Sequence, residues 1–166
     1  EVTLSRIQPS QREKMVADLS NFSSLIGEFP LGNKGTNLEI GLAGCEACLT
    51  VFTRHGHPET WAAIQNNLGI AYSNRMRDDK AENLEKAIGA FEAALEVYNQ
   101  NDHPKEWAKT LNNLGNAYCQ RIRGDKAENQ EKAIQAFERS LEAYKPSDYH
   151  LEWGRTQNNL GIAYSE

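Results

Sequence analysis

Two cysteines and two histidines in the first half of the chain are of the residue types that bind zinc. Cys45 and Cys48 form a Cys-x-x-Cys motif, and His55 and His57 follow shortly after it. Thiolate and imidazole groups are the usual zinc ligands, and Cys-x-x-Cys is also the motif of thiol redox proteins. Buried free cysteines, in contrast, behave as small apolar residues. Whether these side chains bind zinc, carry out thiol redox chemistry or pack in a core depends on the secondary-structure elements that carry them.

An internal repeat with a period of 46 residues organises the chain. Trp61, Trp107 and Trp153 are each 46 residues apart, and 27 of the 46 positions in 61–106 are identical in 107–152 without a gap. A diverged copy precedes these two units and a partial copy follows them, which is the pattern of a repeat protein. The chain therefore divides into a lead-in at 1–14, units at 15–60, 61–106 and 107–152, and the first helix of a fourth unit at 153–166.

Each unit is predicted to form two antiparallel helices, because apolar residues recur every three or four positions in both halves. Asp79, followed by Glu82, and Asn83 are alternative N-caps that place the start of the second helix at 80–84. One helix pair has two apolar faces, so neighbouring pairs must stack to bury them. We expect an all-α fold, an α-solenoid with a linear core. Its apolar positions are Trp61, Ile64, Leu68, Tyr72 and Met76 in the first helix, and Leu84, Ile88, Phe91, Leu95 and Tyr98 in the second.

A glycine recurs at one position of each first helix, at Gly69, Gly115 and Gly161. Glycine inside a helix costs about 1 kcal/mol relative to alanine. Its recurrence predicts a close approach between helices, in which the missing side chain lets two backbones meet.

The repeat register assigns the cysteines to the core. Cys45 falls on the position of Phe91 and Cys48 on that of Ala94, both on the buried face of a second helix. We therefore expect no metal site and no cofactor. No Ser-His-Asp arrangement and no glycine-rich phosphate loop is visible, so the chain is predicted not to be an enzyme.

Charge and hydropathy limit the partners. The net charge of −5 argues against nucleic acid, which needs a surplus of Lys and Arg. No stretch approaches the roughly 18 apolar residues that suggest a membrane span. Free cysteines and the lack of a visible signal peptide predict a cytoplasmic protein.

The pattern Leu68-Gly69-x-x-Tyr72, with Ala87 and Phe91 in the second helix, resembles the tetratricopeptide repeat over about 15–166. The resemblance implies a right-handed superhelix of antiparallel helix pairs, whose first helices line a concave surface that binds a protein or peptide. The usual unit has about 34 residues, so these units are long.

The long unit and the Asn-Asn-Leu run resemble the repeats of kinesin light chains. The turn at 121–129 is similar to that of bacterial, often cyanobacterial, repeat proteins that carry a caspase-like (CHAT) protease. This second resemblance implies an alternative, a sensor or regulatory region of a larger enzyme.

The candidate peptide-binding residues lie on the first helices. One asparagine per unit would offer an amide with two donors and an acceptor to a bound backbone. The alternative is that these amides bond the neighbouring helix and hold the stack. Positions that differ between units would give specificity. The resemblance also implies a partial version of the carboxylate clamp of some tetratricopeptide domains, made of Asn116, Asn159, Lys109 and Arg155, although Asn112 stands where that clamp has a basic residue. The asparagine row is Asn21, Asn67, Asn113 and Asn159, and the flanking candidates are Asn74, Lys109, Asn116, Gln120 and Arg155.

Two further surfaces carry alternative interpretations. Arg75 and Arg121 recur just before acidic turn residues, so they form either an anion patch or, as the net charge favours, ion pairs between a turn and the neighbouring repeat. The helix predicted at 153–166 leaves Trp153, Leu160 and Tyr164 uncovered. Such a face either continues into further repeats or mates with a second copy of the chain.

Overall fold

The computed structural model describes residues 33–165 together with residues 11, 14 and 18. Within the span 33–165 the chain forms six helices and no strand. None of the helices in this part of the chain is long and apolar enough to cross a membrane. The helices are α2 (Lys34–Leu49), α3 (Pro58–Asn74), α4 (Lys80–Leu95), α5 (Pro104–Gln120), α6 (Lys126–Ala143) and α7 (His150–Ser165).

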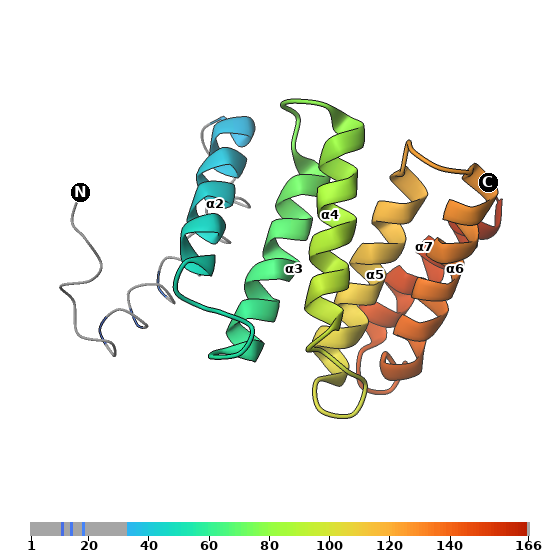
Figure 1. The fold of residues 1–166 in the computed structure, drawn as a ribbon. Coiled ribbons are helices and arrows are strands. Elements are labelled where there is room, and N and C mark those ends of the chain that lie inside the picture. The colour runs from blue at the N-terminus through green and yellow to red at the C-terminus, as the bar shows by residue number, and fades with distance from the viewer. Residues whose placement is uncertain (1–10, 12–13, 15–17, 19–32, 166) are drawn as a thin grey trace.

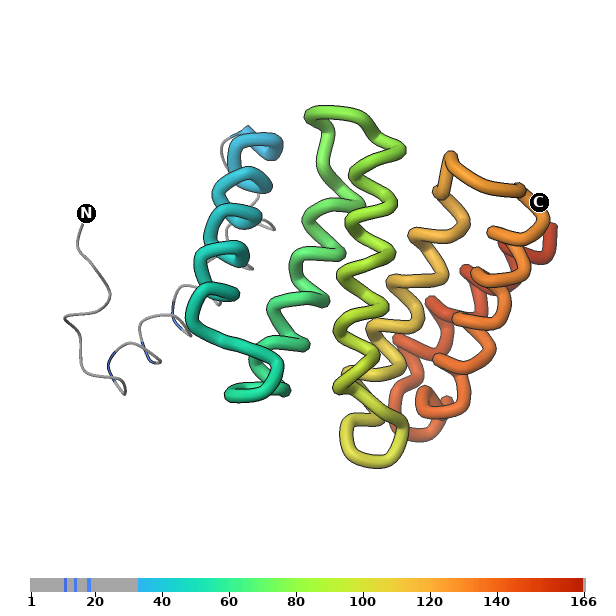
Figure 2. The backbone as a smooth tube through the Cα atoms, in the orientation of Figure 1, coloured from blue at the N-terminus to red at the C-terminus, as the bar shows by residue number. Residues whose placement is uncertain are grey.

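From α2 to α6 the helices follow one another across the molecule in chain order, and α7 overlaps α5 and α6 in this view (Figure 1). The most extensive contacts join α3 to α4 and α5 to α6, and smaller ones join each second helix to the first helix of the next unit. The backbone trace in Figure 2 shows the same up-and-down path from α2 to α7. The predicted all-α solenoid is therefore confirmed.

Local sequence explains where the helices begin. Pro58 and Pro104 occupy the first turns of α3 and α5, where the missing N–H is not needed. Asp79 caps α4 by accepting hydrogen bonds from the backbone N–H groups of Ala81 and Glu82, at 2.7 and 3.2 Å. Asn83 is not the cap. Its amide donates to the carbonyl of residue 77 at 2.7 Å and braces the turn between the helices.

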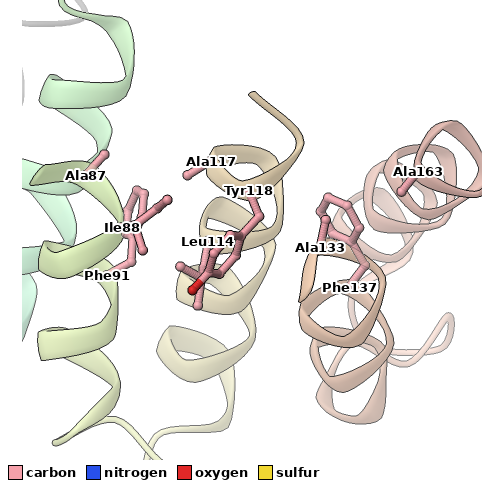
Figure 3. Packing of buried hydrophobic residues seen from close by; sticks show 9 residues of the cluster. All are labelled: Ala87, Ile88, Phe91, Leu114, Ala117, Tyr118, Ala133, Phe137 and Ala163. Atoms are coloured by element: carbon pink, nitrogen blue, oxygen red, sulfur yellow. The ribbon is translucent and has the colours of Figure 1, made fainter. Parts of the chain in front are cut away.

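The core runs along the stack. One buried cluster draws residues from α4, α5, α6 and α7, as Figure 3 shows. Phe91 and Phe137 are its largest fully buried side chains, 1% and 0% exposed. A linear core of this kind is what stacked helix pairs require.

The recurring glycines make room for an aromatic ring. A Cβ atom on Gly69 would lie 2.5–2.7 Å from three ring atoms of Phe91, and one on Gly115 would lie 2.6–2.8 Å from three ring atoms of Phe137. The prediction that two backbones meet here is wrong, because the ring fills the space. We call each glycine and the space above it a socket, and the phenylalanine ring that fills it a knob.

Two further expectations have clear outcomes. Met76 was expected on the apolar face of a first helix, but α3 ends at Asn74 and Met76 lies in the following turn, 71% exposed. That expectation is wrong because Arg75 has already left the helical conformation, with ψ of 127°. Cys45 and Cys48 are buried, at 2% and 0% exposure, which confirms the prediction from the register.

Candidate interaction surface

The predicted peptide-binding residues lie on three successive first helices, and none of those described is buried. Asn21 lies outside the described residues. The others are Asn67 and Asn74 on α3, Lys109, Asn113, Asn116 and Gln120 on α5, and Arg155 and Asn159 on α7.

Paired asparagines link one first helix to the next. The Asn66 side-chain oxygen, on a residue 6% exposed, accepts from the Asn113 amide and from the Thr110 hydroxyl, both at 3.3 Å. One repeat further along, Asn159 donates to the Asn112 side-chain oxygen at 3.1 Å. These bonds support the interpretation that the asparagine row holds the stack, and they use one amide donor on each of Asn113 and Asn159. These bonds do not involve the remaining polar atoms of the row, so peptide binding by those atoms stays a prediction.

Lys109 and Arg155 occupy the same register position on α5 and α7, and both are exposed. Neither forms an ion pair within the part of the chain that the structure describes. Their counterpart on α3 is the half-buried Ala63. Two exposed cations without an ion pair therefore lie at the same position of successive repeats, on the helices that carry the asparagine row.

A second set of polar contacts joins each second helix to the following first helix. Arg75 forms a two-pronged ion pair with Glu39, at 2.8 and 2.7 Å, and Arg121 repeats it with Glu85 at the same distances. The hydrogen bond from each arginine holds the pKa of its glutamate below the usual range. Of the two interpretations of Arg75 and Arg121, the geometry supports ion pairs between repeats.

Tyrosine–glutamate bonds run parallel to these ion pairs. Tyr72 donates to Glu46 at 3.0 Å and Tyr118 to Glu92 at 2.8 Å, and Tyr164 donates to Glu138 at 2.8 Å. Burial, and then the bond to Glu92, raises the pKa of Tyr118 to about 12. Sequence reasoning placed Tyr72 on the apolar face of its helix and Tyr164 on an uncovered face, and predicted a hydrogen bond for neither. The signal that could have revealed the bonds is the constant spacing of 26 residues between partners in all three repeats.

A small hollow opens between α2 and α3, where these two kinds of contact meet. Its charged groups already bond one another, so it offers few free groups to a ligand. The residues that line it are Glu39, Leu42, Ala43, Glu46, Tyr72 and Arg75.

The cysteine motif has the environment of a core. Burial raises the pKa of the Cys45 thiol to about 12, and burial also raises that of Cys48. His55 is exposed on the loop after α2. Among the residues that the structure describes, no group of three His, Cys, Asp or Glu side chains is placed to hold a metal ion.

The comparisons with known proteins agree with the architecture. The tetratricopeptide repeat family model matches residues 61–105 and 107–145, which contain most of α3 to α6. No curated protein and no solved structure matches the chain.

Proposed function

Since the chain belongs to the tetratricopeptide repeat family, whose repeats generally mediate protein–protein interaction, we propose that it binds an acidic peptide on the surface of its first helices. This surface consists of the exposed and half-buried residues of α3, α5 and α7 named above. The proposal assigns no catalytic step to the chain. The likeness to kinesin light chains and to repeat proteins with a CHAT protease stays a prediction, as does the cytoplasmic location.

The pair of Lys109 and Arg155 is the observation that carries the proposal. Both side chains are exposed, both stand at the same position of neighbouring repeats, and neither is neutralised by a carboxylate in the described structure. By contrast, Arg75 and Arg121, which also recur at one register position, each pair with a glutamate of the preceding repeat. Free cations on one face favour a carboxylate-bearing ligand, either acidic side chains or a C-terminal carboxylate.

Amide side chains beside the cations supply hydrogen bonds to a peptide backbone. Asn116 is half-buried on α5, and its counterparts are Ile70 on α3 and Ile162 on α7. Gln120 follows one turn later and is exposed. The surface therefore changes from repeat to repeat on a nearly constant scaffold, which is what recognition of one particular peptide requires.

The test is a titration of a fluorescently labelled peptide with an acidic C-terminal sequence, followed by anisotropy. The double variant Lys109→Ala/Arg155→Ala should bind about tenfold more weakly or worse, because each charge-assisted hydrogen bond contributes about 1.5–3 kcal/mol. The matched control, Lys126→Ala/Lys145→Ala, removes the same charge from exposed positions at the start of α6 and just after it. Equal affinities for the wild type and the Lys109/Arg155 variant would contradict the proposal. Amidation of the peptide C-terminus separates recognition of the terminal carboxylate from recognition of acidic side chains.

A further inference from the structure

The positions of Lys109 and Arg155 set a fixed spacing along the first-helix surface. We propose that this spacing selects a peptide segment in the polyproline II conformation with two acidic side chains three residues apart. The inference rests on the acidic-peptide surface proposed above and names the class of peptide that this surface takes. Its charged groups are internal acidic side chains of a partner protein, not a terminal carboxylate.

The two cations lie on first helices that touch each other. They occupy the same register position on α5 and α7. These helices are in direct contact, and Asn159 donates across the contact to Asn112 at 3.1 Å. Helices packed in direct contact lie about 8–10 Å apart. A ligand that pairs with both cations must therefore present its carboxylates at a similar separation.

The exposure of this register position does not depend on where the chain ends. Lys109 is exposed although other helices of the stack contact α5 on both sides. Glu106 and Glu152 precede the two cations by three residues, and neither forms an ion pair with them in the part of the chain that the structure describes. A ligand carboxylate that misses the cations therefore meets like charge, which sharpens the required spacing.

The separation of the cations distinguishes between regular peptide conformations. Polyproline II has three residues per turn and rises about 3.1 Å per residue, so side chains i and i+3 share a face about 9 Å apart. In a β-strand, side chains on one face are about 7 Å apart at i+2 and about 13 Å apart at i+4. An α-helix presents side chains i and i+7 about 10.5 Å apart. The spacing therefore fits polyproline II or a helix better than a strand.

Amide side chains on the same helices favour polyproline II over a helix. Asn113 and Asn159 each use one amide donor to bond a neighbouring first helix, which leaves a second donor on each. The side chains of Asn116 and Gln120 bond no other residue within the described part of the chain. A helix satisfies its own backbone groups, whereas a polyproline II backbone has no internal hydrogen bonds. The surface therefore matches a ligand whose backbone is open to side-chain amides along its length.

The probes are labelled peptides with blocked termini, titrated by fluorescence anisotropy. One carries two Glu residues separated by two Pro residues, and an isomer of the same composition has the two Glu residues adjacent. A third peptide is an alanine-based helix with its Glu residues seven positions apart. We expect the first peptide to bind about tenfold more tightly than the isomer, because adjacent acids cannot pair with both cations unless these long side chains give up rotamer freedom. It should also bind more tightly than the helical peptide.

A gain of affinity provides a second test. The counterpart of Lys109 on α3 is Ala63, so Ala63→Lys extends the row to three cations. Lysine at the equivalent position of α5 shows that the scaffold accepts it, and circular dichroism checks the fold. A peptide with three Glu residues, each three positions after the last, should bind this variant about tenfold more tightly than it binds the wild type. The control Gln100→Lys adds the same charge at an exposed position in the loop after α4 and should leave the affinity unchanged.

The outcomes separate this inference from the function on which it rests. Absence of binding by every acidic peptide would show that the proposed function itself is wrong. If the two isomers bound equally, and Lys109→Ala/Arg155→Ala still weakened both, the acidic-peptide surface would stand and the spacing rule would be refuted. Tighter binding of the helical peptide, or binding that requires a free C-terminal carboxylate, would equally overturn the polyproline II ligand.

Discussion

The contact between Phe137 and Gly115 gives the sharpest stability prediction, because two glycines of similar helical setting should respond with opposite signs. Gly115 lies inside α5 under the Phe137 ring, and Gly89 lies inside α4 with open space around it. Replacing either glycine with alanine gains about 1 kcal/mol of helix propensity. Only at Gly115 does the new methyl group meet a buried atom.

The distances between Gly115 and the Phe137 ring determine how much the clash opposes the gain in helix propensity. A Cβ atom on Gly115 would lie 2.6–2.8 Å from three ring carbons, roughly 1 Å inside the normal contact distance of about 3.5–4.0 Å. Phe137 is 0% exposed, so its ring moves only if buried neighbours move with it. Overpacking of this kind costs about 1–3 kcal/mol, and the upper end applies to a rigid, fully buried ring. We expect Gly115→Ala to destabilise the fold by about 2 kcal/mol and Gly89→Ala to stabilise it by about 1 kcal/mol.

The assay is urea unfolding followed by circular dichroism, with the midpoint and slope of each variant compared with the wild type. A double-mutant cycle assigns the effect to the ring: Phe137→Leu should cost less in the Gly115→Ala background than in the wild type, since the smaller side chain relieves the clash. If Gly115→Ala stabilised the protein as much as Gly89→Ala does, the interpretation of the glycine as a socket would be refuted.

Other predictions concern the polar contacts and the buried thiol. Asn112→Ala should destabilise by about 1 kcal/mol, because Asn159 loses its acceptor, while Asn158→Ala, an exposed asparagine at the same register position, should change the urea midpoint little. Arg121→Ala should cost about 1–3 kcal/mol in the same assay, because it leaves the partly buried Glu85 carboxylate unpaired. The Glu85 pKa is lower in the folded state, so the stability it contributes is full above its unfolded pKa of about 4.3 and is lost as pH falls through the lowered value. The wild type should accordingly lose stability in acid urea titrations, and Glu85→Gln should lose less. Cys45 should resist alkylation at neutral pH until the protein unfolds, since burial raises its pKa to about 12.

Most of the fold could be predicted from the sequence alone, by means of the repeat register. Equivalent positions must occupy equivalent environments, so Phe91 at a core position placed Cys45 in the core as well. The same logic could not show what each glycine faces, because spacing along the chain does not distinguish a ring from a backbone. It also missed the bond of Tyr72 to Glu46, since a tyrosine at a core position still has a hydroxyl that reaches the helix edge. The binding residues stay predictions because recognition depends on a partner that the chain itself does not specify.

Two kinds of contact explain why some positions repeat identically and others vary. Within a unit a buried ring fills a glycine socket, and between units directional bonds such as Arg121 to Glu85 add to the packing. Apolar packing alone tolerates small shifts, whereas a two-pronged ion pair is lost when helices slide by one turn, so these bonds fix the register between units. The ion-pair positions keep their residue types from unit to unit, Glu39 and Arg75 matching Glu85 and Arg121, whereas the first unit has Cys45 at the position of Phe91. Lys109 and Asn116 belong to neither kind of contact and differ from their counterparts in the other units. These residues are therefore the ones we expect to contact and recognise a specific ligand, since they vary without weakening the stack.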